Sequence, residues 1–598
     1  MSTASTIALV HALDRIQLEM RLAKSDQVAL KCALDRAEAL GEQVARFGIA
    51  DLTCVWHIRK AEILLRLDQP QAAAREARAG ADALGGVRQA DLLVDARVIE
   101  ARALDALMDW QRLDRVCRDG IAVVERYRDD VSAPYLRAGY MRNRIHLYAL
   151  GVKASFKQGD LDSLICRAEL SKCRLMRQSA SASGDLLVAE LRALSTQISE
   201  TEAAGRDATT LQAKRRVVWD RYVIATAEGS SAAVQDLASA QAALAAHEAV
   251  LYHYWLSKHD LLRLVIGPDA AAISLARFTE EERHALDLYA QDLGKDPAAR
   301  ADDFDIEALD HFTTHLWPKD PASVEVLAAA DRLILSPHRV LHALPFAALR
   351  VAGRFVIERW SLRHAPNLGT LVDRVSEDPR RSLLAVGINA YAVPGRALTK
   401  LRQAEAEAQE IAESYAAAGW TVHTQLGATS EDDLTAAARK SDARVLHLAC
   451  HAESVSATTP MESHLYLSQT RLDGLEIPFA GLSARTIVLS ACSAGQRAIA
   501  GRRMPELPGD DLHGLQAAFF SAGAREIIAT LFAVNDDVAR FITAKVHARL
   551  LAGDPADIAL ARALRCYLAE VDAWRQPAGR RYWAPFFLVA LGPNMAQD

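Results

Sequence analysis

Two short stretches of the sequence bring together residue types that are able to do covalent chemistry. The first, HLACHAESVSA at residues 447–457, holds two histidines, one cysteine and one glutamate within its first seven residues. The second, RTIVLSACSAGQ at residues 485–496, is an apolar run that leads to Cys492. Three interpretations are open: a metal site, two ordinary buried strand ends, or the two halves of a catalytic pair.

Both stretches are predicted to be strands that end at the same edge of a parallel sheet. The run ARVLHLAC leads to His451, and the run RTIVLSA leads to Cys492. Functional groups in open parallel sheets lie just beyond the carboxyl ends of the strands. Because side chains alternate along a strand, His447 and His451 should share one face while Cys450 points to the other.

A cysteine and a histidine at one such edge have an evident chemistry. A thiolate at Cys492 would attack a carbonyl carbon, and the imidazole of His451 would keep the thiol deprotonated or protonate the leaving amine. Small residues follow each candidate, Ala452 in the first stretch and SAG at 493–495 in the second. They leave room for backbone N–H groups to face the oxygen of a bound carbonyl.

The other interpretations give these residues different roles. Zinc needs four converging ligands, and strand alternation turns Cys450 away from His451, so the set of His447, Cys450, His451 and Cys492 is a poor metal site. His447 is predicted to be a buried, hydrogen-bonded histidine, and Cys450 a small core residue. The pattern alone leaves open whether the remaining pair is catalytic or structural.

These stretches lie in the second of two regions that differ in periodicity. Residues 1–235 have few prolines and carry apolar residues at three- and four-residue spacing, which predicts helices. A helix, a polar turn and a second helix recur around Asp68, Asp109 and Asp160, about 40 to 50 residues apart. From about residue 250, short apolar runs alternate with amphipathic helices, which predicts a mainly parallel sheet flanked by helices.

The helical region resembles tetratricopeptide-type repeats, although its period is longer and less regular than the 34 residues of that family. Stacked hairpins of this kind form a superhelix with a concave surface for a protein partner. A long helical segment at 184–253, with a break near 228–230, is expected to carry the chain onward.

Composition limits the classes of function. The formal net charge of -6 argues against a dedicated nucleic-acid binder, because neutralising phosphates requires clustered lysine and arginine. No apolar run reaches the roughly 18 residues of a membrane span, and the first residues do not read as a secretory signal. The eight cysteines are scattered without C-x-x-C spacing, so a reducing cytoplasm is the expected location.

The motifs VLHLACHA and IVLSACSAG resemble the paired histidine and cysteine motifs of CHAT domains, a branch of the caspase-like peptidases that is also similar to separases. The resemblance spans roughly residues 240–595, and it implies an amino-terminal part at 240–375 and a caspase-like catalytic domain at 380–598. Further segments match the family in order: LILSPHRVLHALPFAAL (333–349), LTKLRQAEAEAQEI (398–411), GDDLHGLQAAFFSAGAREIIATLFAVNDD (509–537) and YWAPFFLVALG (582–592).

The resemblance implies roles for individual residues. His451 would be the general base and acid, Cys492 the nucleophile, and the main-chain N–H groups of Ala452 and Cys492 the oxyanion site. One position departs from the family pattern, which has glycine where this chain has Ala452. Because alanine avoids positive φ, a positive φ there would strain or displace the oxyanion donor.

Two aspartates are candidates for the substrate pocket. Asp510 belongs to GDD at 509–511, and Asp536 belongs to VNDD at 534–537. The second segment resembles the separase stretch whose acidic residue recognises arginine, which implies a preference for arginine or lysine. The structural alternative is that Asn535 or Asp536 caps the helix that follows.

The expected function is therefore a regulated cysteine endopeptidase that acts on a protein substrate, requires no cofactor or metal and is activated by a protein partner on the helical repeats. Similar bacterial proteases act in defence or programmed cell death, so the resemblance implies a pathway of that kind. The alternative is an inactive CHAT-like scaffold that works through protein–protein contacts.

Overall fold

The structure is a computed structural model that divides into two compact units. One comprises Met1–Ser171 with Gln235–Leu237, and the other comprises Lys172–Val234 with Ala238–Asp598. The residues that it describes are 3–85, 89–130, 144–172, 176–178, 182–230, 236–257, 259–293, 308–371, 378–393, 396–453, 463–490, 514–570, 580 and 582–592.

The first unit is helical throughout its described residues, as the apolar periodicity predicts. Consecutive helices pack against each other from α4 to α10, and their facing sides form a core of small and aliphatic side chains. The helices are α1 (Thr3–Ala23), α2 (Gln27–Ala39), α3 (Gly41–Phe47), α4 (Ala50–Arg66), α5 (Pro70–Ala83), α6 (Ala90–Ala106), α7 (Trp110–Asp130), α9 (Ile145–Gln158) and α10 (Leu161–Leu170).

The three turns that the sequence predicts around Asp68, Asp109 and Asp160 join the pairs α4–α5, α6–α7 and α9–α10. Each turn contains a left-handed residue, with φ of 58° at Asp68, 55° at Met108 and 71° at Gly159. In each turn a backbone N–H donates to the carbonyl five residues earlier, for example Gln69 to Leu64 and Asp109 to Leu104. This bond satisfies a carbonyl at the helix end and closes a tight antiparallel hairpin.

The second unit is built on one 11-stranded sheet in the order β11-β10-β12-β16-β17-β18-β9-β6-β3-β4-β5. Pairing is parallel from β11 to β17 and from β18 to β3, and antiparallel at β17–β18 and at β3–β4–β5. The strands are β3 (Ala249–Leu256), β4 (Asp260–Ile266), β5 (Ala271–Arg277), β6 (Arg332–Ser336), β9 (Ser361–His364), β10 (Ser382–Gly387), β11 (Thr421–Leu426), β12 (Val445–Ala449), β16 (Thr486–Ser490), β17 (Glu526–Thr530) and β18 (Phe586–Ala590).

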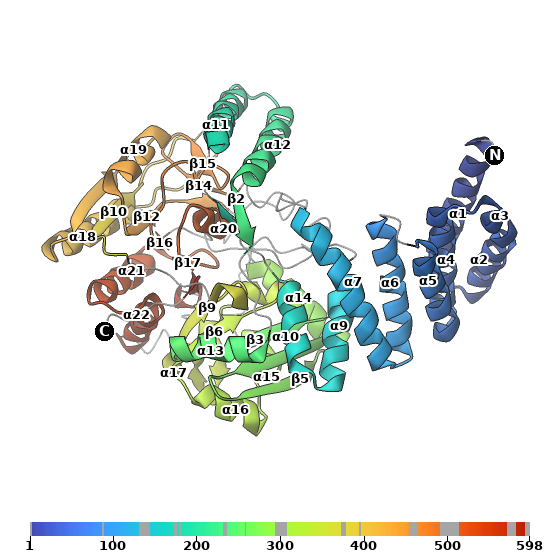
Figure 1. Ribbon diagram of the computed structural model, residues 1–598. Helices are drawn as coiled ribbons and strands as arrows, with labels where there is room; N and C mark the ends of the chain where they lie inside the picture. The colour runs from blue at the N-terminus through green and yellow to red at the C-terminus, as the bar shows by residue number, and fades with distance from the viewer. Residues whose placement is uncertain are drawn as a thin grey trace. The chain divides into compact units, whose positions relative to one another are not determined.

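The predicted fold class, a helical region followed by a mainly parallel α/β region, is confirmed. The two predicted parts of the α/β region, 240–375 and 380–598, contribute strands to the same sheet, because β9 pairs with β18. Helices lie beside the strands in Figure 1. They are α13 (Leu237–His247), α14 (Glu280–Leu293), α15 (Ala308–Leu316), α16 (Pro321–Ala328), α17 (Val356–Arg359), α18 (Ala404–Ala417), α19 (Glu431–Ser441), α20 (Leu515–Ser521), α21 (Asp536–Leu551) and α22 (Ala556–Glu570).

The central strands are almost entirely buried, which explains their continuous apolar sequences. One face of β10 and β12 packs on α18 through Leu383, Ala385, Ile411 and Val445, and Leu551 of α21 packs against the same cluster. These two helices therefore cover the face of β12 that also carries His447.

A helical hairpin, α11 (Ala182–Ala203) and α12 (Thr209–Thr226), belongs to the second unit. The sequence predicts one long helical segment at this point, but the chain reverses between the two helices, where Gly205 has a φ of 67°. The expected break near 228–230 is a short strand, β2 (Ala227–Ser230), which pairs with β1 (Met176–Gln178). Figure 1 shows the hairpin beside a three-stranded sheet of β13 (Ala452–Glu453), β14 (His464–Tyr466) and β15 (Arg471–Asp473).

Candidate active site

The carboxyl ends of β12, β16 and β17 form the rim on which the sequence places the candidate residues. These three strands are adjacent and parallel, with Ala449 paired to Ser490 and Val488 paired to Ile528. A pocket lies at this rim. It is lined by Leu401, Gln403, Ala404, Glu407, Ala449, Cys450, Ser490, Thr530, Val534, Asp536, Ala539 and Phe586.

His451 follows the end of β12 and is held by the loop that precedes α18. Its Nε2 lies 2.7 Å from the carbonyl oxygen of Thr399, and its backbone N–H donates to the hydroxyl of Tyr391 at 3.0 Å. The Tyr391 ring also packs on the imidazole, with 4.8 Å between the ring centroids. The tyrosine is fixed in turn, because its hydroxyl donates to the carbonyl of Ile388 at 2.9 Å.

The contact with Thr399 determines which nitrogen of His451 carries a proton. A carbonyl oxygen only accepts hydrogen bonds, so Nε2 must be the protonated nitrogen in this contact. In the neutral ring Nδ1 then carries the lone pair, and it is the atom able to accept a proton. The contact with Thr399 thus sets the tautomer of His451 and leaves Nδ1 as the nitrogen that can take up a proton.

Ala452 lies in an extended segment, so the alanine at this position causes no strain. It forms β13 with Glu453, pairs with Leu465 of β14, and is not among the described residues with positive φ. The N–H of Tyr466 donates to the carbonyl of His451 at 2.8 Å, which makes Ala452 and Leu465 a non-hydrogen-bonded pair. The N–H of Ala452 therefore faces away from β14, as an oxyanion donor requires.

Asp536 lies at the pocket, and its neighbour Asn535 is the residue that caps α21. The Asn535 side chain accepts from the N–H of Asp537 at 2.9 Å, so Asp536 is the first helical residue and is free of the capping role. Burial raises the pKa of Asp536, while His451 and the backbone N–H of Arg402 partly offset that effect.

A chain of buried polar side chains lies beneath the pocket. The Tyr415 hydroxyl contacts Nδ1 of His547 at 3.1 Å, Nε2 of His547 contacts Nδ1 of His447 at 3.2 Å, and Nε2 of His447 lies 3.4 Å from Glu407. Thr543 donates to Glu407 at 2.6 Å. If the tyrosine donates its proton, His547 is neutral and donates its own N–H to Nδ1 of His447, whose Nε2 approaches the Glu407 carboxyl without a hydrogen bond.

Burial determines the charge states of these buried side chains. It raises the pKa of Glu407 to about 7, an effect that hydrogen bonds from Thr543 and Ser490 partly offset. Burial lowers the pKa of His447 to about 3 and that of His547 well below its ordinary value. His447 is therefore the buried, hydrogen-bonded residue that the sequence predicts, and Cys450 is buried at the strand end.

Two of the predicted site residues, Cys492 and Asp510, lie outside the described residues. The described strand before Cys492 ends at Ser490, which pairs with Ala449, and His451 follows Ala449 by two positions just as Cys492 follows Ser490. Among the described residues, no group of three or more histidine, cysteine or acidic side chains is arranged to hold a metal ion.

Sequence reasoning assigned no role to Tyr391, Thr399 or Glu407. Thr399 and Glu407 lie within LTKLRQAEAEAQEI, which the family resemblance singles out without indicating what each residue does. A backbone carbonyl such as that of Thr399 leaves no mark in the residue type. A glutamate on the buried side of an otherwise apolar helix face, as at Glu407, is the one signal that the sequence offered.

A family model matches most of the α/β region, beginning later than the predicted span of 240–595. Residues 307–592 match the CHAT domain family. The match confirms the resemblance carried by the histidine and cysteine motifs, and it supports a caspase-like protease fold for this region. The CHAT region includes β6 and every later strand of the large sheet, together with the pocket and His451.

Similar solved structures include two crystal structures of the Saccharomyces cerevisiae separase–securin complex. The first has 10% identity and a TM-score of 0.39, covering 98% of this chain and 57% of that chain. The second has 9% identity and a TM-score of 0.36, covering 97% and 53%. This chain thus spans a little over half the length of either. Among curated proteins, none matches the sequence.

Over the part of the chain that the structure describes, none of the helices is long and apolar enough to cross a bilayer.

Proposed function

We propose that this protein is a cysteine endopeptidase in which Cys492 is the nucleophile and His451 carries the protons. The observation that supports this best is the register of β12 and β16. Each candidate follows its parallel strand by two residues beyond the pair Ala449 and Ser490, so the two residues are expected at neighbouring points of one rim.

In the proposed reaction, the Cys492 thiolate attacks the carbonyl carbon of the scissile peptide bond and forms a carbon–sulfur bond. The thiol proton of Cys492 has first passed to Nδ1 of His451, and as the carbon–nitrogen bond breaks, Nδ1 gives this proton to the leaving amine. Water then attacks the thioester, His451 takes a proton from it, and the acid product leaves with the thiol restored. The N–H groups of Ala452 and Cys492 would stabilise the negative oxygen.

The pocket beside His451 is proposed to bind the side chain that precedes the scissile bond. Asp536 lines this pocket, and the buried carboxyl of Glu407 lines it as well. A basic side chain would complement the Asp536 carboxylate, so arginine or lysine is the proposed preference. Asp510, the other candidate, stays a prediction.

Regulation through a protein partner is the second part of the proposal. The helices of the first unit form antiparallel hairpins of the kind that stack into partner-binding surfaces. We infer that partner binding to repeats within 1–235 activates the peptidase in the cytoplasm, in a bacterial defence or cell-death pathway. No direct contact with nucleic acid or membrane is part of this function.

The competing function is an inactive scaffold with a CHAT-like fold. Its main support in the sequence is the alanine that follows His451. Because Ala452 adopts an extended conformation with its N–H turned away from β14, the methyl group costs the oxyanion site no backbone strain. This observation favours the peptidase over the scaffold.

The test is covalent labelling by a peptidyl acyloxymethyl ketone with arginine at the reactive position. We expect the wild-type chain to be labelled at Cys492, and to be labelled faster when an activating partner is bound, as mass spectrometry of the modified peptide would show. His451→Gln should reduce the labelling rate about 100-fold or more, because general acid–base catalysis contributes factors of this size.

Matched aspartate variants test the pocket in the same assay. Asp536→Asn should lower the preference for the arginine probe over a norleucine probe, whereas Asp537→Asn, on the exposed neighbour, should not. A wild-type chain that is never modified at Cys492, under any condition, would contradict the peptidase function and support the scaffold.

A further inference from the structure

The hairpin α11–α12 is attached to the CHAT region through a buried arginine. Arg215 of α12 places Nη2 2.7 Å from Oδ2 of Asp473 in β15, and the two side chains are 3% and 2% exposed. The guanidinium also donates to the Ser195 hydroxyl of α11 at 3.3 Å and lies 3.8 Å from Glu476. A cation with these partners in the interior fixes the helix to β15 in one geometry.

From Asp473 a row of ionisable side chains crosses the three-stranded sheet toward His451. Asp473 stands opposite His464 of β14, and His464 stands opposite Glu453 of β13. The His464 ring lies between the two carboxylates, with Nδ1 3.7 Å from Asp473 and Nε2 3.4 Å from Glu453. The row ends at the surface, where Arg396 lies 3.3 Å from Glu453.

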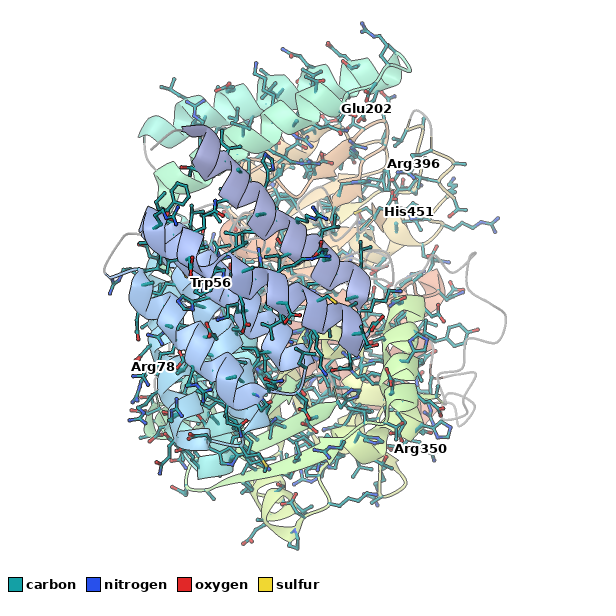
Figure 2. The ribbon with its side chains drawn as sticks, turned by 90° about the vertical axis from the view of Figure 1, so that its right-hand side faces the viewer. Trp56, Arg78, Glu202, Arg350, Arg396 and His451 are labelled. Atoms are coloured by element: carbon teal, nitrogen blue, oxygen red, sulfur yellow. The ribbon has the colours of Figure 1, made fainter. Side chains whose placement is uncertain are left out.

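Other groups face this row from neighbouring elements. Arg471 approaches Asp473 at 3.2 Å and Glu202 of α11 at 3.3 Å, and the Tyr466 ring packs on His464. Hydrogen bonding with His464 lowers the pKa of Glu453 to about 2, so this carboxylate is charged across the physiological range. In Figure 2, Glu202, Arg396 and His451 follow one another along one side of the CHAT region.

The row reaches the backbone of the candidate site directly. Glu453 follows His451 by two residues in the same segment, and the carbonyl of His451 accepts a hydrogen bond from the N–H of Tyr466, two residues after His464. A displacement of β15 or β14 therefore moves the carbonyl of His451 and the peptide that bears the Ala452 N–H.

We propose that Arg215 is a positioning residue for the segment His451–Ala452, acting through Asp473, His464 and Glu453. This inference rests on the proposed function, since it assigns α12 a part in aligning the base and the oxyanion donor. It also gives a route by which a movement of the hairpin changes reactivity at the rim.

The test compares labelling rates by the same arginine probe, each corrected for the folded fraction. Asp473→Asn and Arg215→Gln should each slow the reaction at Cys492 by about tenfold or more, because small misplacements of reacting groups carry costs of this size. Arg215→Lys, which keeps the charge, should restore part of the rate. Arg221→Ala is the matched control on the same helix, because Arg221 is 60% exposed.

A variant with a single unpaired charge in the interior can fail to fold, so a double variant is included. Arg215→Met with Asp473→Asn removes both charges and with them the cost of an isolated buried ion. We expect this protein to fold and to remain slow. If the folded double variant reacts at the wild-type rate, Arg215 has only a structural role and the inference is overturned.

A second measurement keeps the inference separate from the peptidase function. Histidine 13Cε1 NMR of the full chain reports on His451, whose resonance is assigned by its loss in His451→Gln. The chemical shift of this resonance should change in Asp473→Asn and stay the same in Arg221→Ala. An unaltered His451 resonance in Asp473→Asn would refute the positioning role, whatever the reactivity of Cys492. Absence of labelling in the wild type would instead refute the proposed function alone.

Discussion

Glu407 has the most unusual environment among the residues of the pocket. Its side chain is 4% exposed, accepts a hydrogen bond from Thr543, and lies beside the row of His447, His547 and Tyr415. Burial favours the neutral form of each group, so both histidines are uncharged at neutral pH and Glu407, with a pKa of about 7, is only partly ionised there.

The raised pKa of Glu407 predicts a pH-dependent contribution to stability. The pKa is about 7 in the folded chain against an ordinary value of 4.5, so the stabilisation is fully present below pH 4.5 and is lost as the pH rises through 7. We compare the free energies of unfolding of Glu407→Gln and wild type at each pH. From pH 5 to pH 8 this difference should shift by about 2 kcal/mol in favour of Glu407→Gln. Urea unfolding of the full chain at several pH values measures this difference.

The lowered pKa values of His447 and His547 make the chain more stable as the pH rises, which is the opposite effect. Both histidines are present in wild type and in Glu407→Gln, so this effect cancels when the two proteins are compared. Glu410→Gln serves as the control, because Glu410 lies one turn later on α18 and pairs with Arg540 at the surface. A difference between wild type and Glu407→Gln that does not change with pH would show that Glu407 is ionised in the folded chain.

Single residues differ in how far the sequence indicates their place. A histidine directly after an apolar run is visible in the sequence, so His451 is expected just beyond a strand end, and β12 ends two residues before it. The expected alternation of Cys450 and His451 does not apply to them, because the strand ends at Ala449, and Cys450 lines the pocket. Tyr391 and Thr399 were not predicted, because they reach His451 from about 50 to 60 positions away and one of them contributes only a main-chain carbonyl.

At the level of elements, the pocket depends on how closely α18 approaches the end of β10. A β-carbon added at Gly387 would lie 2.5 Å from the carbonyl oxygen of Ala404 and 2.9 Å from Cα of Glu405. The first turn of α18 therefore packs directly on the strand backbone. This turn also brings Gln403, Ala404 and Glu407 to the pocket.

Gly387→Ala is predicted to destabilise the chain by about 1–3 kcal/mol, the usual cost of inserting a methyl group where the backbone has no room. Urea unfolding measures the loss, and hydrogen exchange should localise it to α18. Gly553→Asn is the control, because nothing lies within 4 Å of a β-carbon at Gly553 and asparagine tolerates its φ of 87°. Equal stability of Gly387→Ala and wild type would mean that α18 moves away freely.

The elements themselves were largely predictable from periodicity. The buried strands of the CHAT region are short apolar runs bounded by polar residues, and the hairpin turns of the first unit coincide with the predicted junctions. The hairpin α11–α12 was not recognised. Its reversal near Gly205 looks like an ordinary glycine in a polar stretch, and its membership of the second unit depends on Arg215 meeting Asp473, 258 positions away.

At the level of the whole molecule, a helical unit is joined in one chain to a unit that carries the CHAT region. The fold class followed from the change in periodicity near residue 250. The extent of the second unit could not be predicted from periodicity. Residues 172–234 have the same helical composition as the first unit, and their long-range contacts place them in the second unit. Regulation of one unit by the other is part of the proposed function and is tested by partner-dependent labelling.

The central claim is that His451 and Cys492 act as a pair, and the pH dependence of Cys492 alkylation tests it most directly. Iodoacetamide labelling of the full chain is followed by mass spectrometry, with the exposed Cys32 as internal reference. We predict that Cys492 is alkylated at pH values well below the ordinary thiol pKa of about 8.5. In His451→Gln, the pH at which the alkylation rate of Cys492 rises should move up to about 8.5, while the pH dependence of Cys32 stays the same. Identical profiles for Cys492 in wild type and His451→Gln would contradict the account.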